Sequence, residues 1–288
     1  MHNFVIQFKK GCLILLLLSA NGCSYLVSSA TDDFGNNLKQ AMLNSSDPVM
    51  VAEAIPAYLM LQEALLVGDP DNESMLVSTA NLYSSYNTLT DKIDRARKQA
   101  LAQKAFDHVL HAACLHKNDF CLLNEKKFDD VTTIIGQTDN NDLDTLYSLA
   151  KHWTHWIQAN STDWNAIAQL AQAKYIMNHV TMLQEDYKKG EAFLYLGVME
   201  SVVPPALGGK PDLVKSHFEK AMQLSSNNLM INVLYAKHYA RMMFDRELHD
   251  TLLNKVVGAS AEKKGLVLSN TLAKKQAKEL LKSADDYF

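Results

Sequence analysis

Apolar residues recur every three or four positions over most of the chain, which is the spacing of one face of an α-helix. Short alternating runs bounded by turn residues, the pattern of β-strands, are hard to find. No proline occurs between Pro70 and Pro204, glycine is scarce there, and alanine, leucine, glutamine, lysine and methionine are abundant. The pattern therefore predicts an all-α protein.

The first pair of helices has start and stop signals. Asp47 is placed as an N-cap with Pro48 at the first helical position. Pro56 predicts a break between a short leading helix and a longer one, which ends near Gly68. Residues 69–72 form a tight turn before a second helix. The apolar residues of that second helix are Leu76, Ala80, Leu82, Tyr83 and Tyr86. Together these segments predict a helical hairpin.

Similar helix pairs follow. A Phe-x-x-Ala-x-x-Leu segment at Phe218, Ala221 and Leu224 precedes a turn at 225–228 and a second helix. Segments 167–182 and 191–202 form a weaker copy. This is the tetratricopeptide-like (TPR-like) pattern, in which each hairpin needs a stacked neighbour to bury its apolar face. We therefore expect stacked TPR-like helical hairpins, an α-solenoid-type single domain, over residues 47–288.

The last helix predicts a packed C-terminus. Ser269 is a candidate cap, and an apolar stripe runs from there to the last residue. The stripe consists of Leu272, Ala273, Ala277, Leu280, Leu281, Ala284 and Phe288.

The N-terminus reads as a lipoprotein signal. Lys9 and Lys10 precede an apolar stretch over residues 12–18 that is too short to span a bilayer. Small residues then lead to Gly22 and Cys23, between which we expect cleavage, followed by lipidation of Cys23. Ordinary secretion with cleavage after a loose A-x-A-like site is the alternative. Residues 1–22 would be the signal and residues 23–46 a polar tether, and Ser24 favours the outer over the inner membrane.

Two cysteines remain in the exported chain. Cys114 and Cys121 would be too far apart to bridge on one unbroken helix, but residues 116–119 between them look like a turn. In an oxidising compartment this pair forms either a disulfide or two separately buried thiols.

Composition and motifs exclude several functions. Acidic residues outnumber basic ones 32 to 28, and no basic cluster was found, so neither nucleic acid nor anionic lipid is an expected partner of the folded body. No nucleotide-binding, metalloprotease or hydrolase motif occurs, and we expect no cofactor, no metal and no enzymatic activity. His108 with His111 and His152 with His155 lie at helical spacing, but they lack further ligands to complete a metal site.

A ligand cleft is a further hypothesis. Trp153 and Trp156 share one helical face, either as a packing anchor, which we favour, or as an aromatic wall of a cavity. The proline and glycine loop at 204–209 forms either a rigid rim of a cleft or a plain helix stop. The candidate cleft residues are Tyr83, Tyr86, Trp153, Trp156, Pro205, Gly208 and Gly209.

Four segments carry a resemblance to a known family. They are Asp47-Pro48 through Pro56 to Pro70-Asp71-Asn72; Leu146-Tyr147 with Trp153; Pro205-Ala206-Leu207-Gly208-Gly209-Lys210 with the helix at His217–Ala221; and the tail from Leu272 to Phe288. The chain resembles the T-component lipoproteins of tripartite ATP-independent periplasmic (TRAP) transporters. Among these segments, the Pro-x-x-Gly-Gly element before the Phe-x-x-Ala helix is the most specific.

The resemblance implies a lipid-anchored helical-repeat protein that faces the periplasm. It implies a homotrimer with apolar channels or clefts that docks a periplasmic solute-binding protein and passes it a small hydrophobic ligand. A TPR-type lipoprotein scaffold for envelope protein assembly is the alternative.

Overall fold

The computed structural model describes residues 35–90 and 93–288, and no strand occurs among them, which confirms the all-α fold class. Gly22 and Cys23 lie outside the described residues. A helix over residues 35–43 comes first. The helices that follow are α2 (Pro48–Gly68), α3 (Glu73–Leu89), α4 (Arg95–His116), α5 (Phe128–Ile135), α6 (Leu143–Ala159), α7 (Trp164–Ala168), α8 (Leu170–Leu183), α9 (Glu191–Glu200), α10 (Pro211–Leu224), α11 (Leu229–Tyr235), α12 (Arg246–Gly258), α13 (Val267–Lys282) and α14 (Ala284–Tyr287).

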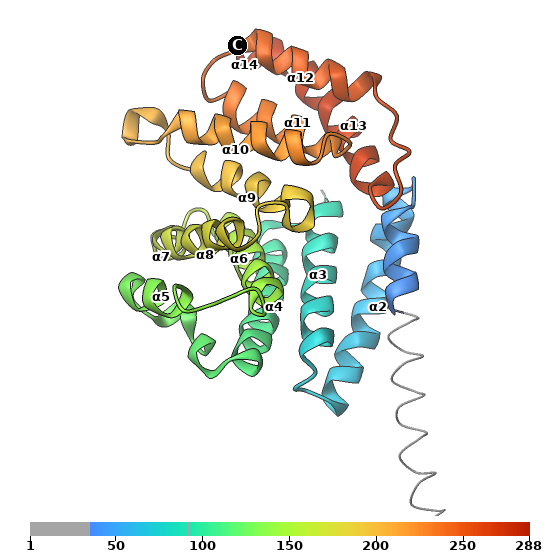
Figure 1. The fold of residues 1–288 in the computed structure, drawn as a ribbon. Helices are drawn as coiled ribbons and strands as arrows, with labels where there is room; N and C mark the ends of the chain where they lie inside the picture. Colours follow the sequence, from blue (N-terminus) through green and yellow to red (C-terminus); the bar gives the residue numbers. More distant parts are fainter. Residues whose placement is uncertain (1–34, 91–92) are drawn as a thin grey trace, which may run out of the picture.

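The longer helices stack largely in chain order (Figure 1). α3 packs against α2, α4 against α3, α6 against α4, α8 against α6, and the series continues through α9 and α10 to α13. Successive antiparallel helices are what the predicted hairpins require, and the arrangement is compatible with a TPR-like stack. The last long helix then returns to the first, because α13 contacts α2.

Two large clusters of buried side chains form most of the core. One spans α2 to α9 and includes Leu268 of α13, and the other spans α9 to α13. A third, small cluster joins α2, α3 and α4. α9 belongs to both large clusters: Leu196 and Met199 enter the first cluster, whereas Leu194 and Val198 enter the second. A helix such as α9 that is apolar on opposite sides can pack against both clusters at once, so it lies in the middle of the core.

The first hairpin follows its predicted signals except at one residue. The Asp47 side chain accepts hydrogen bonds from the backbone N–H groups of Val49 and Met50, which confirms the N-cap. The predicted break at Pro56 is wrong, because α2 runs through that residue. Ile55 and Leu59, on either side of it, are almost completely buried, and this burial outweighs the backbone hydrogen bond that proline removes.

The C-terminal helix also begins earlier than expected. α13 starts at Val267, so Ser269 lies inside the helix and is not its cap. Val267 and Leu268 are both buried, and their packing fixes the first turn. Phe288 contacts the ring of His249 edge-on with 5.1 Å between centroids, so the C-terminus is packed as expected.

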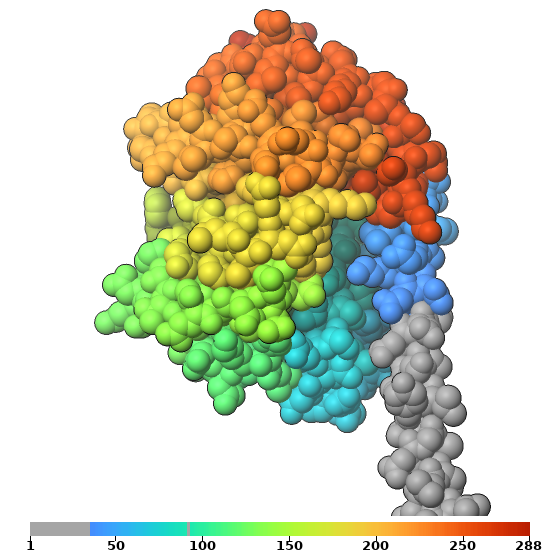
Figure 2. Space-filling view, in the orientation of Figure 1, coloured from blue at the N-terminus to red at the C-terminus, as the bar shows by residue number. Residues whose placement is uncertain are grey.

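The end of the expected tether belongs to the folded part. Residues 35–43 are helical, and Met42 packs against the first core cluster. The Gly265 N–H donates to the Asn44 side chain at 2.7 Å, which joins this segment to the loop before α13. Figure 2 shows the consequence: the blue N-terminal residues lie against the red C-terminal ones.

Close packing also defines the α9–α10 contact. Phe218 and Ala221 of α10 are fully buried, as their repeat-like spacing predicts. A Cβ atom on Gly197 of α9 would lie 3.0 Å from the Phe218 ring, so any larger residue there would require the ring to shift.

A disulfide secures the junction between α4 and α6. Cys114 and Cys121 are bonded to each other across the turn that ends α4. Inside the closed loop, His116 and Lys117 contact the Asp142 carboxylate at 3.1 and 3.4 Å. Asp142 precedes α6, so the loop holds the start of the central helix.

Replacing both cysteines tests this junction. Cys114→Ser with Cys121→Ser should lower the free energy of unfolding by about 2 kcal/mol, because the unfolded chain regains the entropy of a short open loop. Urea denaturation followed by circular dichroism measures the change. A reductant should lower the urea midpoint of wild-type unfolding to that of the variant and leave the midpoint of the variant unchanged. A wild-type midpoint that does not change with reductant would contradict the account.

Candidate functional site

The two candidate tryptophans pack against one phenylalanine. Phe106 of α4 lies 5.5 Å from the Trp153 ring and 5.4 Å from the Trp156 ring, between centroids. The indole N–H groups donate to Gln169 at 2.9 Å and to Gln103 at 2.6 Å. These are the contacts of a packing anchor, with Trp153 fully buried.

The two candidate tyrosines of α3 make separate polar contacts, Tyr83 with Glu63 of α2 and Tyr86 with Arg97 of α4. The Tyr83 hydroxyl donates to Glu63, and the Glu63 carboxylate also contacts His108 at 3.2 Å. Burial raises the pKa of Glu63, but the bonds from Tyr83 and His108 and the nearby Lys104 charge outweigh it and lower the pKa overall. Tyr86 lies under the Arg97 guanidinium at 5.8 Å.

The candidate loop residues lie elsewhere. Pro205 and Gly208 are exposed in the turn between α9 and α10. Gly208 has φ of +89°, and a Cβ atom on Gly209 would lie 1.9 Å from the Val203 carbonyl oxygen, so both positions require glycine. The four aromatic residues share the first core cluster, whereas this loop is outside it. The structure therefore divides the predicted cleft residues into separate places.

Another face of α6 brings polar groups together in the interior. His152 is fully buried, and its Nδ1 atom lies 2.9 Å from the Ser84 hydroxyl of α3. The neighbouring Lys151 ammonium donates to the Asn81 side chain of α3 at 2.9 Å. Two helices of the core thus meet through polar contacts.

The same face of α6 continues toward α9. His155 Nε2 lies 3.4 Å from the Tyr195 hydroxyl, and the Tyr147 and Tyr195 rings meet edge-on at 6.2 Å. Two imidazole atoms on this face, His152 Nε2 and His155 Nδ1, have no hydrogen-bond partner among the described residues. The buried Tyr147 hydroxyl interacts with the Glu191 carboxylate. Buried polar atoms in native proteins are normally bonded, so a cluster of unbonded ones marks a candidate site.

Burial controls the charge of this cluster. Burial, together with the Lys151 and His155 charges, lowers the pKa of His152 well below its usual value. Burial and the Lys151 charge lower the pKa of His155 to about 3. Burial also lowers the pKa of Lys151 and raises those of Tyr147 and Tyr195, the tyrosines being further affected by the Glu191 charge. Both imidazoles are therefore neutral at pH 7 and offer hydrogen bonds without charge.

The outer edge of the cluster is closed by an ion pair. Lys188 Nζ lies 3.3 Å from Asp144 and stands 4.3 Å from the Tyr147 ring centroid and 4.8 Å from that of Tyr187. Tyr187 also donates a hydrogen bond to Asp144. Lys188 has a left-handed backbone with φ of 46°, which turns its side chain over the two rings.

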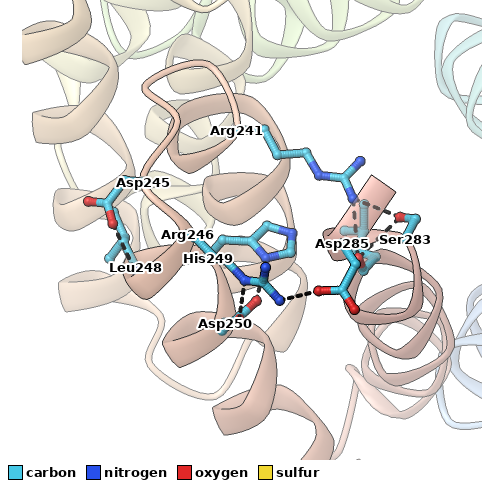
Figure 3. A network of polar contacts seen from close by, with 9 residues as sticks. Arg241, Asp245, Arg246, Leu248, His249, Asp250, Ser283 and Asp285 are labelled. Atoms are coloured by element: carbon cyan, nitrogen blue, oxygen red, sulfur yellow. Dashed lines mark hydrogen bonds and ion pairs between the residues drawn. The ribbon is translucent and has the colours of Figure 1, made fainter. Parts of the chain in front are cut away.

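Two other polar regions are less suited to be the site. An open groove of about 550 Å³ along α13 is lined mainly by Thr271, Lys274, Lys278 and Glu279, and none of the predicted cleft residues borders it. Figure 3 shows a network near the C-terminus in which Arg246 bonds Asp285 and Asp250, and Arg241 bonds Ser283. These contacts connect α12 to the C-terminal turns.

The α6 cluster offers neutral hydrogen-bonding groups beside aromatic rings. The described residues hold no group of three or more histidine, cysteine or acidic side chains able to bind a metal. Neutral imidazoles and hydroxyls with aromatic walls can orient a small molecule by hydrogen bonds.

Comparison with known families gives one result that covers most of the chain. The sequence model described as TRAP transporter T-component matches residues 44–288. The chain belongs to the TRAP transporter T-component family. No functionally curated protein matches it at a significant level. Membership associates this T-component with TRAP transport and with the bacterial envelope, and the family is a transporter component, not an enzyme family.

Sequence reasoning missed the central residues of the T-component's candidate site. The spacing of His152 and His155 places them on one side of α6, but it does not predict that His152 is fully buried, whereas His155 is partly buried. Tyr195 was not considered, and Tyr147 was used only for the family resemblance. Their meeting depends on the pairing of α6 with α9, which the periodicity of either helix alone does not reveal.

The pH dependence of stability tests the burial of the two histidines. From pH 7 to pH 5 the unfolded chain, with a histidine pKa near 6.5, gains protons that the folded T-component does not. The free energy of unfolding should therefore fall, by about 2 kcal/mol for each histidine. Urea denaturation across this range measures it.

Replacing one histidine isolates its share. His155→Gln should flatten the slope of stability against pH, whereas His111→Gln, on the exposed side of α4, serves as the matched control. Equal slopes for wild type and His155→Gln would show that His155 is not buried in the neutral form.

Proposed function

We propose that this T-component is a lipid-anchored envelope protein that binds a small hydrophobic ligand and passes it to the periplasmic solute-binding protein of a TRAP transporter. The anchor would be Cys23 after cleavage behind Gly22. Ser24 favours attachment to the outer membrane, facing the periplasm. The family assignment and the export signal support this role.

The α6 cluster carries the ligand part of the proposal. Hydrogen-bonding groups that are neutral at pH 7 stand beside the rings of Tyr147 and Tyr195, and His152 Nε2 and His155 Nδ1 have no partner there among the described residues. A ligand that matches them has an apolar body and one hydrogen-bonding group, which would meet Tyr147, His152 and His155. Charge on the ligand is not required, because both imidazoles are neutral.

The remaining expectations join this proposal. The rigid 204–209 loop would form a docking element on the surface, and Trp153 and Trp156 would support the site from the opposite side of α6. A homotrimer is proposed from the family resemblance. The alternative of a peptide-binding scaffold is less well supported, because α13 contacts α2 and the first and last helices meet.

Ligand retention tests the proposal. The lipoprotein, purified in mild detergent, should carry a small molecule that native mass spectrometry detects. Tyr147→Phe keeps the ring and removes one hydroxyl, so it should weaken ligand binding by up to about tenfold, the equivalent of one hydrogen bond, and lower the ligand content of the purified protein. Tyr83→Phe removes a hydroxyl that bonds Glu63 and is the matched control.

The partner is tested in the same preparation. Adding the periplasmic solute-binding protein of a TRAP transporter from the same bacterium should form a complex and deplete the ligand from the T-component. Equal ligand content in both variants would contradict the site, and the absence of any complex would contradict the transfer role.

A further inference from the structure

The outward face of α2 is apolar. Met60 is 72% exposed and Val67 is 85% exposed, and the buried side chains of α2 lie on the opposite side of the helix. Glu53 is the charged residue of the outward face. The exposed apolar residues are Val49, Met50, Ala54, Ala57, Met60, Leu61, Ala64, Leu65 and Val67. A helix that is apolar all round is normally covered on every side.

α2 is long and apolar enough to cross a membrane, with a mean hydropathy of 1.4, but its contacts keep it in the domain. The Gln62 amide donates to Ser78 at 2.8 Å and accepts from Thr79 at 2.9 Å, and Ile55 and Leu59 are buried in the core. The helix can therefore present one face to another surface without leaving α3.

The proposed anchor enters the molecule beside this face. A Cβ atom on Gly35 would lie 3.5 Å from the Tyr58 hydroxyl, near the middle of α2. Twelve peptide units separate Cys23 from Gly35, so the acylated residue cannot be farther than about 40 Å from this point. Acyl chains on Cys23 would hold the α2 side of the molecule close to the bilayer.

Local charge fits the same surface. Lys263 and Lys264 are exposed in the loop before α13, next to Gly265, whose N–H binds Asn44 close to the start of α2. Figure 1 shows this loop against the N-terminal end of α2. Glu262 also lies there, so Glu262, Lys263 and Lys264 together carry a net charge of +1. The loop is therefore locally basic although the net charge of the chain is acidic.

We propose that the outward face of α2, with Lys263 and Lys264 at its end, lies in the headgroup region of the phospholipid bilayer that holds the anchor. This inference rests on the lipidation of Cys23 in the proposed function. An apolar helix face bordered by lysines is the composition of interfacial membrane contacts. The protein would then stand in a fixed orientation, with α8 and α9 away from the membrane.

Fluorescence quenching tests this orientation. Met60→Cys carries a bimane probe on the face, and Met182→Cys carries it on exposed α8, which is separated from α2 in the stack by α3, α4 and α6. The mature lipoprotein is reconstituted in phosphatidylethanolamine–phosphatidylglycerol vesicles with nitroxide-labelled lipid. We expect quenching of at least about twofold at position 60, because interfacial helices insert their apolar face between the headgroups. The probe at position 182 should stay unquenched.

Charge and competing occupants give separate outcomes. Lys263→Gln with Lys264→Gln should reduce quenching at position 60, and unchanged quenching would overturn the role of the lysines. If nitroxide lipid does not quench the probe at position 60, the proposal is overturned. If iodide, a quencher dissolved in the water, then loses access to that probe as the protein concentration rises, a second copy of the chain covers the face.

Failure of the anchor is recognised independently. Mass spectrometry of the N-terminal peptide reports the acyl chains on Cys23. If the acyl chains are absent, the lipidation of Cys23 is refuted. Quenching at positions 60 and 182 can then be compared after vesicles are added to the unanchored protein, and this comparison still decides whether the α2 face binds lipid.

Discussion

Burial of α6 is the constraint on which the rest of the molecule depends. The helix is enclosed by α3, α4, α8 and α9. On one side Trp153 packs against Phe106 and fixes the stack, and on another His152, His155 and Tyr147 occupy the interior. An apolar core tolerates such polar groups only where they are bonded or where a partner meets them. The packing of α6 thus both holds the fold and creates the candidate ligand site.

The return of α13 to α2 gives the stack a second property. The Asn44 contact with Gly265 joins segments from opposite ends of the chain. This contact places a lysine-containing loop beside the outward face of α2, on the side where the chain enters from Cys23. The α6 cluster would then bind the ligand in the interior, while the outward face of α2 would orient the same domain at a membrane.

Much of the fold was predictable because its signals are local. The Asp47 cap and the spacing of Phe218 and Ala221 each depend on a few neighbouring residues. The errors at Pro56 and Ser269 arose because tertiary burial overrode a local rule: Ile55 and Leu59 keep α2 continuous, and Val267 and Leu268 start α13 early.

The candidate site was less predictable for a physical reason. Tyr147 and Tyr195 meet only after α6 and α9 pack together, and no spacing along the chain records that pairing. The four aromatic residues proposed for a cleft belong to one core cluster, and Trp153 makes the contacts of the packing anchor that its spacing favours. The net charge of the chain likewise does not show that Lys263 and Lys264 lie together in the loop before α13, beside the start of α2.

Side-chain nitrogen NMR of the histidines tests the central claim most directly. Spectra of the lipoprotein purified with its ligand are compared with spectra after unfolding in urea, dialysis and refolding. The account predicts that the His152 and His155 resonances move when ligand is removed, whereas those of His108 and His111, which contact Glu63 and Asp71, stay in place. Unchanged His152 and His155 resonances in a preparation shown to have lost its ligand would contradict the claim that this face of α6 binds it.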